Sequence, residues 1–242
     1  MKIMAGLGTI INVAGIIAGG LFGMLFGIAL IERYQETLTA AIGICTLFIG
    51  ISGALSKMLT FSDGKFDTTG TMMLIGSFAI GALIGEWLDI ESRMEQFGRW
   101  LKVKTGSEKD ASFVDGFVTA SLTVCIGAMA VVGSIQDGIN GDYSILAAKA
   151  ILDLIIVMIM TASMGKGCVF SAIPVAVFQG TITLLARLLE PLMTEQALSN
   201  LSLTGSVMIF CVGVNLVWGK KIRVANLLPG LIVAVIWAFL PL

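Results

Sequence analysis

Long apolar runs, separated by short polar segments, are the feature that most constrains how this chain folds. The hydrocarbon core of a bilayer is about 30 Å thick, and a helix needs about 20 residues to cross it. The runs do not alternate between apolar and polar residues, as the strands of a membrane β-barrel would. We therefore expect an all-α integral membrane protein with about eight transmembrane helices, at 4–31, 37–59, 71–88, 113–134, 144–164, 168–189, 203–218 and 224–240.

The composition agrees with this fold class. The 242 residues are 57% hydrophobic and 13% charged, and the net charge is −1. A soluble domain has about 25% charged residues, so too little polar surface is present here to cover a soluble particle. The charge balance gives no reason to expect nucleic acid as a partner. Histidine, the commonest transition-metal ligand, is absent and the cysteines lie singly, so we expect no cofactor and leave the metal question open.

The basic residues predict the orientation, because Lys and Arg collect in cytoplasmic loops. One set of loops holds most of them, namely Arg33, Arg93, Arg99, Lys102, Lys104, Lys109, Lys166, Lys220, Lys221 and Arg223. The other set holds Lys2, Lys57, Lys65 and Arg187. This asymmetry predicts that both termini lie outside. The apolar runs themselves predict the lipid bilayer as the surroundings of the chain.

The longest polar segment carries a helical pattern of its own. Its apolar residues recur at helical spacing, at Ile90, Met94, Phe97 and Leu101, with basic residues on either side. The pattern predicts a cytoplasmic amphipathic helix near 89–104, either in the anionic membrane surface or packed on neighbouring loops. No linker divides the chain, so we expect residues 1–242 to form a single polytopic domain.

A weak internal repeat relates the first three spans to the last three. PheIleGlyIleSer at 48–52 resembles CysValGlyValAsn at 211–215, and LeuIleGly at 74–76 resembles LeuProGly at 228–230. Because an odd number of spans separates the copies, they would face opposite ways, around a central helix pair. Inverted repeats of this kind are typical of secondary transporters.

The first span contains a ridge of glycines. Gly15, Gly19, Gly23 and Gly27 recur every four residues, which lets a second helix approach closely. We expect the ridge to serve helix packing. The partner helix can belong to the same chain or to a second copy, so a homo-oligomer such as a dimer is compatible with the pattern.

Lys149 and Asp153 are two ionisable residues deep inside the fifth predicted span. Four residues apart, they share one helix face and can form an ion pair. Charges at such depth are expensive and usually mark a pathway. The alternative is a structural pair that only fixes the helix register.

Polar residues near this span complete the candidate site. Gln136, Asp137, Asn140 and Asp142 fall in a predicted loop at 136–142 without any basic residue, a composition that suits a cation or a zwitterionic solute. The alternative is an ordinary solvated turn. Further candidates lie inside other spans, at Asn12, Gln179 and Asn215, where an amide can bind a ligand or only join two helices.

Four segments resemble one known family. They are residues 8–23, CysIleGlyAlaMetAlaValValGlySerIleGlnAspGly at 125–138, AlaLysAlaIleLeuAsp at 148–153 and GlyValAsn at 213–215. Together they resemble the bacterial YdfK/YqgA family of multispanning membrane proteins, in which the position of Ala150 is often serine. The resemblance implies a location in the bacterial cytoplasmic (inner) membrane. It marks Asn12, Asp137, Lys149 and Asp153 as family positions without assigning them a role.

These observations favour a small secondary transporter or permease for a small solute or a cation, with a path near the fourth and fifth spans. Two other classes stay open. One is a membrane scaffold or assembly protein in which Lys149 and Asp153 are structural. The other is an intramembrane enzyme acting on lipid, although the sequence contains no recognisable catalytic set, and we expect the chain not to be an enzyme.

Overall fold

The computed structural model describes residues 5–27, 32–62 and 65–240, which are almost entirely helical. In chain order the elements are α1 (Leu7–Gly27), α2 (Glu32–Met58), β1 (Leu59–Ser62), β2 (Lys65–Thr68), α3 (Thr71–Leu88), α4 (Ile90–Lys104), α5 (Phe113–Cys125), α6 (Ala128–Asn140), α7 (Ser144–Met164), the 3-10 helix η1 (Lys166–Ser171), α8 (Ala172–Leu184), α9 (Ala186–Leu189), η2 (Glu190–Leu192), α10 (Glu195–Trp218), η3 (Val224–Leu227) and α11 (Pro229–Trp237). The all-α fold expected from the sequence is confirmed.

Six helices in the described part of the chain are long and apolar enough to cross a membrane. They are Leu7–Gly27, Arg33–Met58, Thr71–Leu88, Ser144–Met164, Lys166–Leu184 and Glu195–Trp218. The bent pair α5 and α6 makes a seventh if it counts as one span. The last predicted span forms only a shorter apolar helix over Val224–Trp237, so the predicted number of eight is not confirmed.

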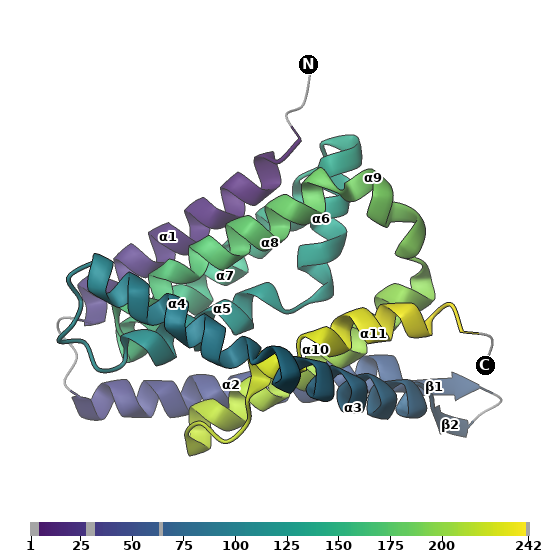
Figure 1. Ribbon diagram of the computed structural model, residues 1–242, viewed down its shortest axis with the longest axis horizontal. Helices are drawn as coiled ribbons and strands as arrows, with labels where there is room; N and C mark the ends of the chain where they lie inside the picture. The colour runs from purple at the N-terminus through teal and green to yellow at the C-terminus, as the bar shows by residue number, and fades with distance from the viewer. Residues whose placement is uncertain (1–4, 28–31, 63–64, 241–242) are drawn as a thin grey trace. The chain divides into compact units, whose positions relative to one another are not determined.

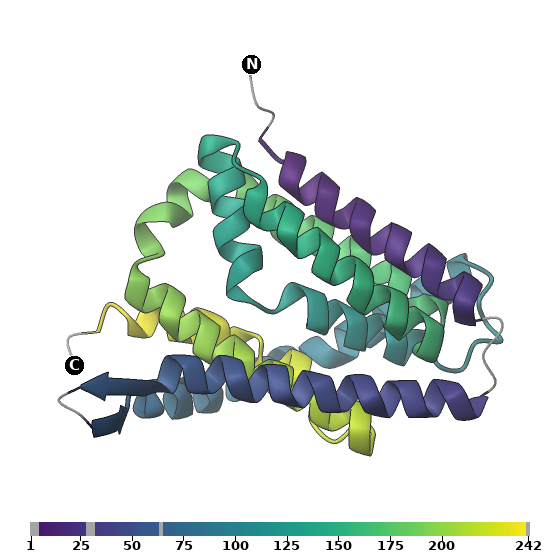
Figure 2. The same cartoon turned by 180° about the vertical axis from the view of Figure 1, so that it is seen from behind.

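The fourth predicted span, 113–134, is not one continuous helix. It breaks between Cys125 and Ala128, and the axes of α5 and α6 differ by 63° (Figure 2). Gly127 lies in the break with φ 153°, a backbone conformation that side chains disfavour. The expected loop at 136–142 was also wrong, because α6 continues through Gln136 and Asp137 to Asn140. Asp137 can lie within the helix because its carboxylate accepts a hydrogen bond from the Gly8 N–H of α1.

The chain folds into two compact units. The first unit comprises Met1–Ile42, Arg93–Cys125 and Met129–Glu190. It contains α1, most of α4, and α5 to α9. The second unit comprises Gly43–Ser92, Ile126–Ala128 and Pro191–Leu242, and so contains the end of α2, the hairpin, α3, α10 and α11.

Within the first unit, α1 and α7 run parallel and side by side (Figure 1). The glycine ridge faces α7. A Cβ at Gly15 would lie 2.9 Å from the carbonyl oxygen of Ala150, and one at Gly19 would collide with that of Leu154. The other two glycines approach α7 one and two turns further along. The partner helix of the ridge is therefore α7 of the same chain.

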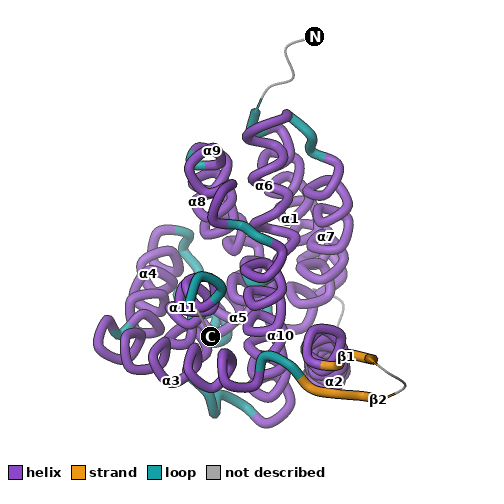
Figure 3. Tube along the Cα trace, turned by 90° about the vertical axis from the view of Figure 1, so that its right-hand side faces the viewer, coloured by secondary structure: helices purple, strands orange, loops and turns teal. Residues whose placement is uncertain are grey.

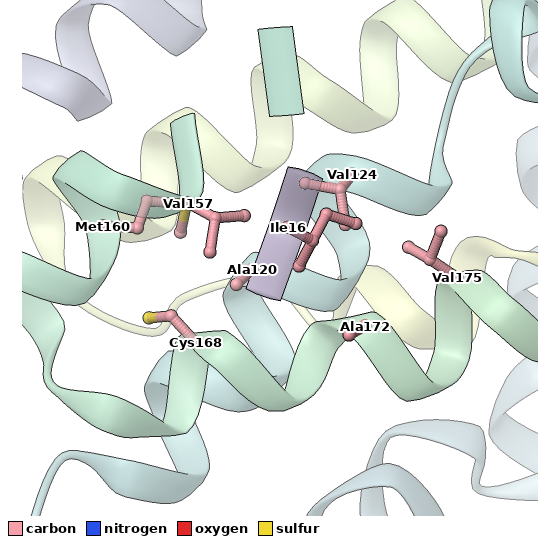
Figure 4. Packing of buried hydrophobic residues seen from close by; sticks show 8 residues of the cluster. All are labelled: Ile16, Ala120, Val124, Val157, Met160, Cys168, Ala172 and Val175. Carbon is pink, nitrogen blue, oxygen red and sulfur yellow. The ribbon is translucent and has the colours of Figure 1, made fainter. Parts of the chain in front are cut away.

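Beside this contact lies the apolar centre of the first unit (Figure 4). Ile16 of α1, Val124 of α5, Val157 of α7 and Val175 of α8 pack together, with at most 1% of each exposed. The four helices therefore contact one another at the level of these residues. This contact sets the positions of the four helices along one another, and their polar residues lie about one turn away.

The second unit uses the same packing device on other helices. A Cβ at Gly81 of α3 would collide with the backbone of Gly230 in α11, and one at Gly85 would collide with the carbonyl of Asn226. Ala54, Met73, Leu203 and Ala234 form its apolar cluster. The hairpin of β1 and β2, drawn orange in Figure 3, follows α2 directly.

Candidate functional site

Lys149 and Asp153 form a closed ion pair on α7. The ammonium nitrogen of Lys149 lies 2.8 Å from Oδ1 and 2.7 Å from Oδ2 of Asp153. The side chains are only 9% and 4% exposed. A buried charge is tolerated when a partner neutralises it, and this pair satisfies that condition within one helix.

Asn12 brings an amide from α1 to the same place. On either side of it along α1, Gly8 faces Leu146 and Gly15 faces Ala150 of α7, so Asn12 faces α7 between them. The Asn12 side chain acts on the Asp153 carboxylate as a hydrogen-bond donor, although the contact falls outside strict hydrogen-bond geometry. Asn12 is fully buried, and its amide has no other partner among the described residues.

Gln179 of α8 lies at the level of Asn12. The hydroxyl oxygens of Thr9 and Thr183 lie 3.5 Å apart, and Ile16 packs with Val175 two turns further along α1. Between these two contacts, antiparallel α1 and α8 place Asn12 and Gln179 side by side. Gln179 is also fully buried, and both of its amide atoms lack a partner among the described residues.

The C-terminal end of α5 reaches the same level. Cys125, its last residue, interacts electrostatically with both Lys149 and Asp153. The last turn of a helix carries carbonyl oxygens without intrahelical partners and the negative end of the helix dipole. The interruption after Cys125 therefore leaves polar backbone near the ion pair. We call Asn12, Cys125, Lys149, Asp153 and Gln179 the polar layer.

Asp137 lies one turn beyond the polar layer. Its Oδ2 accepts a hydrogen bond from the backbone N–H of Gly8 at 3.0 Å, which joins α6 to the start of α1. The carboxylate is fully buried, and Oδ1 has no described partner. Ser134, three residues earlier on the same helix, is also fully buried, and its hydroxyl has no described partner.

A cavity of about 410 Å³ opens beside Asp137 at this end of the unit. Gly6 and Thr9 of the α1 end, Gly138 of α6, and Gly180 and Thr183 of α8 line it, together with Arg187. Thr9, which follows Gly8, and Gly138, which follows Asp137, thus border the cavity. Its lining is mainly apolar and small, and Arg187 is its charged group.

The remaining predicted site residues lie elsewhere. Gln136 is half-buried and Asn140 is exposed, both on α6. Asn215 belongs to the second unit, where its Oδ1 accepts from the N–H groups of Lys221 and Ile222 and its Nδ2 donates to the Ile222 carbonyl. Its amide holds the turn after α10, so we leave it out of the site. Asp142 is exposed after α6, and the Ser144 N–H that it accepts lowers its pKa from the ordinary value.

Among its described residues, the first unit offers one buried, neutralised ion pair, the amides of Asn12 and Gln179, three buried hydroxyls without partners and one unpartnered carboxylate oxygen. The hydroxyls belong to Ser134, Thr161 and Ser171. Buried polar atoms normally have partners, so each exception calls for an explanation. Among the described residues, no three or more Asp, Glu, Cys or His side chains come together to hold a metal ion. The arrangement can bind a small polar molecule or ion, but it contains no evident nucleophile and base.

Sequence reasoning missed Ser134, Thr9, Thr183 and the break after Cys125. The spacing of Ser134 and Asp137, three residues apart, would have placed both on one face of a helix. Gly127 inside an apolar run was the available signal for the break. The two threonines gave no signal, because their contact depends on how α1 and α8 pack.

The apolar spanning helices and the buried polar residues define a polytopic α-helical membrane protein. The chain belongs to the family described as "Protein of unknown function (DUF554)", whose sequence model matches residues 7–239. It is 28% identical to "Uncharacterized membrane protein YdfK" of Bacillus subtilis (strain 168), over 93% of each chain. It is also 28% identical to "Uncharacterized protein YqgA" of Escherichia coli (strain K12), over 94% of each chain. No solved structure matches the chain significantly.

Proposed function

We propose that this protein is a small secondary transporter of the bacterial cytoplasmic membrane, with both termini outside. Its path follows α5, α6 and α7 in the first unit. Lys149 and Asp153 bind a small polar solute or a cation together with the amides of Asn12 and Gln179. The exposed apolar side chains of the spanning helices contact lipid.

The observation that carries the proposal is the combination of two poorly satisfied buried amides with a broken span. An amide buried in helix packing is normally hydrogen-bonded across the helices, whereas the Gln179 amide has no described partner and the Asn12 amide acts only on the Asp153 carboxylate. Irregular backbone at membrane depth is tolerated where it is buried in protein or lines a water-filled cavity. Transporters use such broken helices to coordinate substrates and ions. The ion pair beside the end of α5 fits this use.

The packing of α2 against α10 in the second unit supports the inverted repeat. Gly50 and Gly213 occupy equivalent positions in the two copies. Gly50 faces the backbone of Phe210, and Gly213 faces the backbone of Leu47, which is the position equivalent to Phe210. Exchanging the copies therefore reproduces the contact, as expected for two antiparallel helices related by a pseudo-two-fold axis.

The pair α3 and α11 also packs through glycines at equivalent positions, Gly76 and Gly230. Gly76 packs against Trp237 of α11, and Gly230 packs against Ser77 and Gly81 of α3. The position equivalent to Trp237 is Leu83, so exchanging the copies does not reproduce these contacts. The contact between α2 and α10 is therefore the one that supports the repeat architecture on which many transporters are built.

The test is uptake and binding by proteoliposomes across a panel of labelled cations, amino acids and small organic ions. The key variant is Lys149→Met with Asp153→Leu, because a buried pair can be exchanged for apolar residues at little cost in stability. A matched control is Glu95→Gln with Arg99→Gln, which removes an exposed i, i+4 pair on α4 with an N–O distance of 3.4 Å. We expect wild type and the control to transport, and the apolar variant to fold but lose transport.

The alternative classes predict other outcomes. If the apolar variant keeps full transport, the pair is structural and the proposed path is wrong. If no solute moves or binds in any variant while the apolar variant still restores growth or assembly in cells, a scaffold is favoured. Loss of a lipid-modifying activity in Asp153→Asn, without solute movement, would indicate an intramembrane enzyme.

A further inference from the structure

We infer that α4 binds anionic phospholipid at the membrane surface. Arg93 and Lys104 contact the headgroups, and Phe97 and Trp100 lie at the boundary between the headgroups and the acyl chains. The inference goes beyond the proposed function and does not rest on it, since any class of membrane protein can use such a helix. It gives an occupant to a face of α4 that the described residues leave exposed.

The inner face of α4 is occupied by the protein itself. A Cβ at Gly98 would lie 2.9 Å from the ring of Phe117 in α5. Leu101 is buried, and Met94 is half-buried. Most of the apolar stripe expected from the sequence is therefore used for packing within the chain. It does not account for the large apolar side chains that remain on the other side of the helix.

These side chains form a second row that faces away from the protein. Arg93, Phe97, Trp100 and Lys104 follow one another at intervals of three or four residues and so lie on one face of the helix. Trp100 is 53% exposed, Phe97 38% and the adjacent Val103 61%. The rings of Phe97 and Trp100 stack with their centroids 5.6 Å apart. An exposed apolar patch with a polar rim is typical of a surface that contacts a partner or a membrane.

The charges of the row favour anionic lipid as the partner. Arg93 and Lys104 are exposed, and their side chains form no ion pair or hydrogen bond with another described residue. The two acidic residues of the helix, Glu91 and Glu95, each have a basic partner of their own. Anionic headgroups attract Lys and Arg close to the membrane surface, and tryptophan prefers the level of the headgroups. Aromatic residues between two available cations match both preferences.

The direction of α4 agrees with a position at the membrane surface. Within the first unit, α4 is inclined to α1 and α7, whereas those two helices run parallel to each other (Figure 1). Both α1 and α7 are long and apolar enough to cross a membrane, while an amphipathic surface helix lies in the plane of the bilayer. The asymmetry of the basic residues predicts α4 on the cytoplasmic side, where the leaflet carries anionic lipid.

The test measures which molecules reach Trp100. A variant with Trp100 as its single tryptophan, made by replacing Trp87, Trp218 and Trp237 with phenylalanine, is placed in vesicles of phosphatidylcholine and phosphatidylglycerol. Bromine quenches tryptophan fluorescence on contact, so brominating one lipid at a time reports which lipid lies beside Trp100. We expect phosphatidylglycerol to be enriched about fivefold or more around this residue.

Charge variants of the same protein identify the residues responsible. Arg93→Gln with Lys104→Gln should abolish the preference, so that both brominated lipids quench equally at equal mole fraction. The matched control is Lys57→Gln with Lys65→Gln, which removes the same charge from exposed positions outside α4 and should keep the preference. If the single-tryptophan protein does not fold, Trp100→Phe in the otherwise unchanged chain should lose the part of the quenching that prefers phosphatidylglycerol.

Several results would overturn the inference. Equal quenching of Trp100 by the two lipids would remove the preference for anionic lipid, and a preference that survives loss of Arg93 and Lys104 would assign it to other residues. Quenching by dissolved acrylamide but by neither lipid would place α4 in water. Quenching by none of them would mean that protein, either another part of the chain or a second copy, covers the helix. None of these results changes the role of Lys149 and Asp153, which uptake measures separately.

Discussion

The two units of this protein pack their helices in the same way but treat their polar residues differently. Gly19 in the first unit and Gly85 in the second both bring two helix backbones into contact. In the second unit, buried Glu91 accepts from the Ala225 N–H at 2.9 Å and contacts Lys220 at 3.0 Å. Asn200 donates to the Ala234 carbonyl at 3.1 Å.

In the first unit, by contrast, Gln179 is fully buried without any described partner, Asn12 acts only on the Asp153 carboxylate, and Asp137 uses one of its two oxygens. The second unit has a smaller exception, the Nδ2 atom of Asn226. Satisfied polar groups fix an architecture, whereas unsatisfied ones are available to a ligand. This difference is the reason that we propose the site in the first unit.

The largest expected effect comes from removing only one of the two charges of the Lys149–Asp153 ion pair. Asp153→Asn leaves the Lys149 ammonium buried without its counter-charge, which should cost about 3–5 kcal/mol. Adding Lys149→Met should restore most of that loss, because no buried charge remains. Unfolding of both variants in mild detergent measures the two values. Equal instability of the single and the double variant would contradict the described pair.

Glycine contacts should be similarly sensitive in both units. Gly19→Val and Gly85→Val each place a side chain against the backbone of a neighbouring helix, at a cost of about 1–3 kcal/mol or more. The control is Gly180→Ala, which meets open space and should be neutral or stabilising by up to about 1 kcal/mol. Thermal unfolding measures all three variants. A neutral result for Gly19→Val would show that α1 does not contact α7 as described.

The asparagines give the sharpest contrast between the units. Asn200→Leu removes hydrogen bonds to the Ala234 carbonyl and from Gln196, and should destabilise the protein by about 1–3 kcal/mol. Asn12→Leu removes only the interaction with the Asp153 carboxylate, which falls outside strict hydrogen-bond geometry, and should cost less, about 1 kcal/mol or below, yet abolish transport. Stability and uptake are measured on the same samples. A stability loss in Asn12→Leu as large as in Asn200→Leu would remove the distinction.

The smallest effect concerns Asp142, which is exposed. The Ser144 N–H lowers its pKa below the ordinary value of 3.8. Because the folded-state pKa is depressed, the carboxylate contributes stability above pH 3.8, and this contribution is lost as the pH falls through the lower folded value. Asp142→Asn should therefore show a slightly weaker loss of thermal stability in acid than wild type. Identical acid profiles would contradict the contact.

Sequence patterns predicted those features of the structure that depend on a single helix. The apolar runs predicted the spanning helices, and the i, i+4 spacing predicted the pair of Lys149 and Asp153. What the sequence could not predict depends on contacts between distant helices. Asp137 was expected in a loop because its neighbours in the sequence are polar. It lies instead within α6, where it accepts a hydrogen bond from the N–H of Gly8, a residue far away in the chain. The break at Gly127 was likewise hidden, because its neighbours are apolar enough for a continuous span.

The most direct test of the central claim uses a native cysteine. Cys125 lies in the polar layer, whereas Cys45 is exposed on a spanning helix and should contact lipid. Single-cysteine variants retaining one or the other, with the remaining cysteines replaced by alanine, can be exposed in proteoliposomes to a small, charged thiol reagent. If the polar layer becomes hydrated during transport, Cys125 should react and Cys45 should not. Reaction of Cys125 no faster than Cys45 would contradict the proposal that this layer is a transport path.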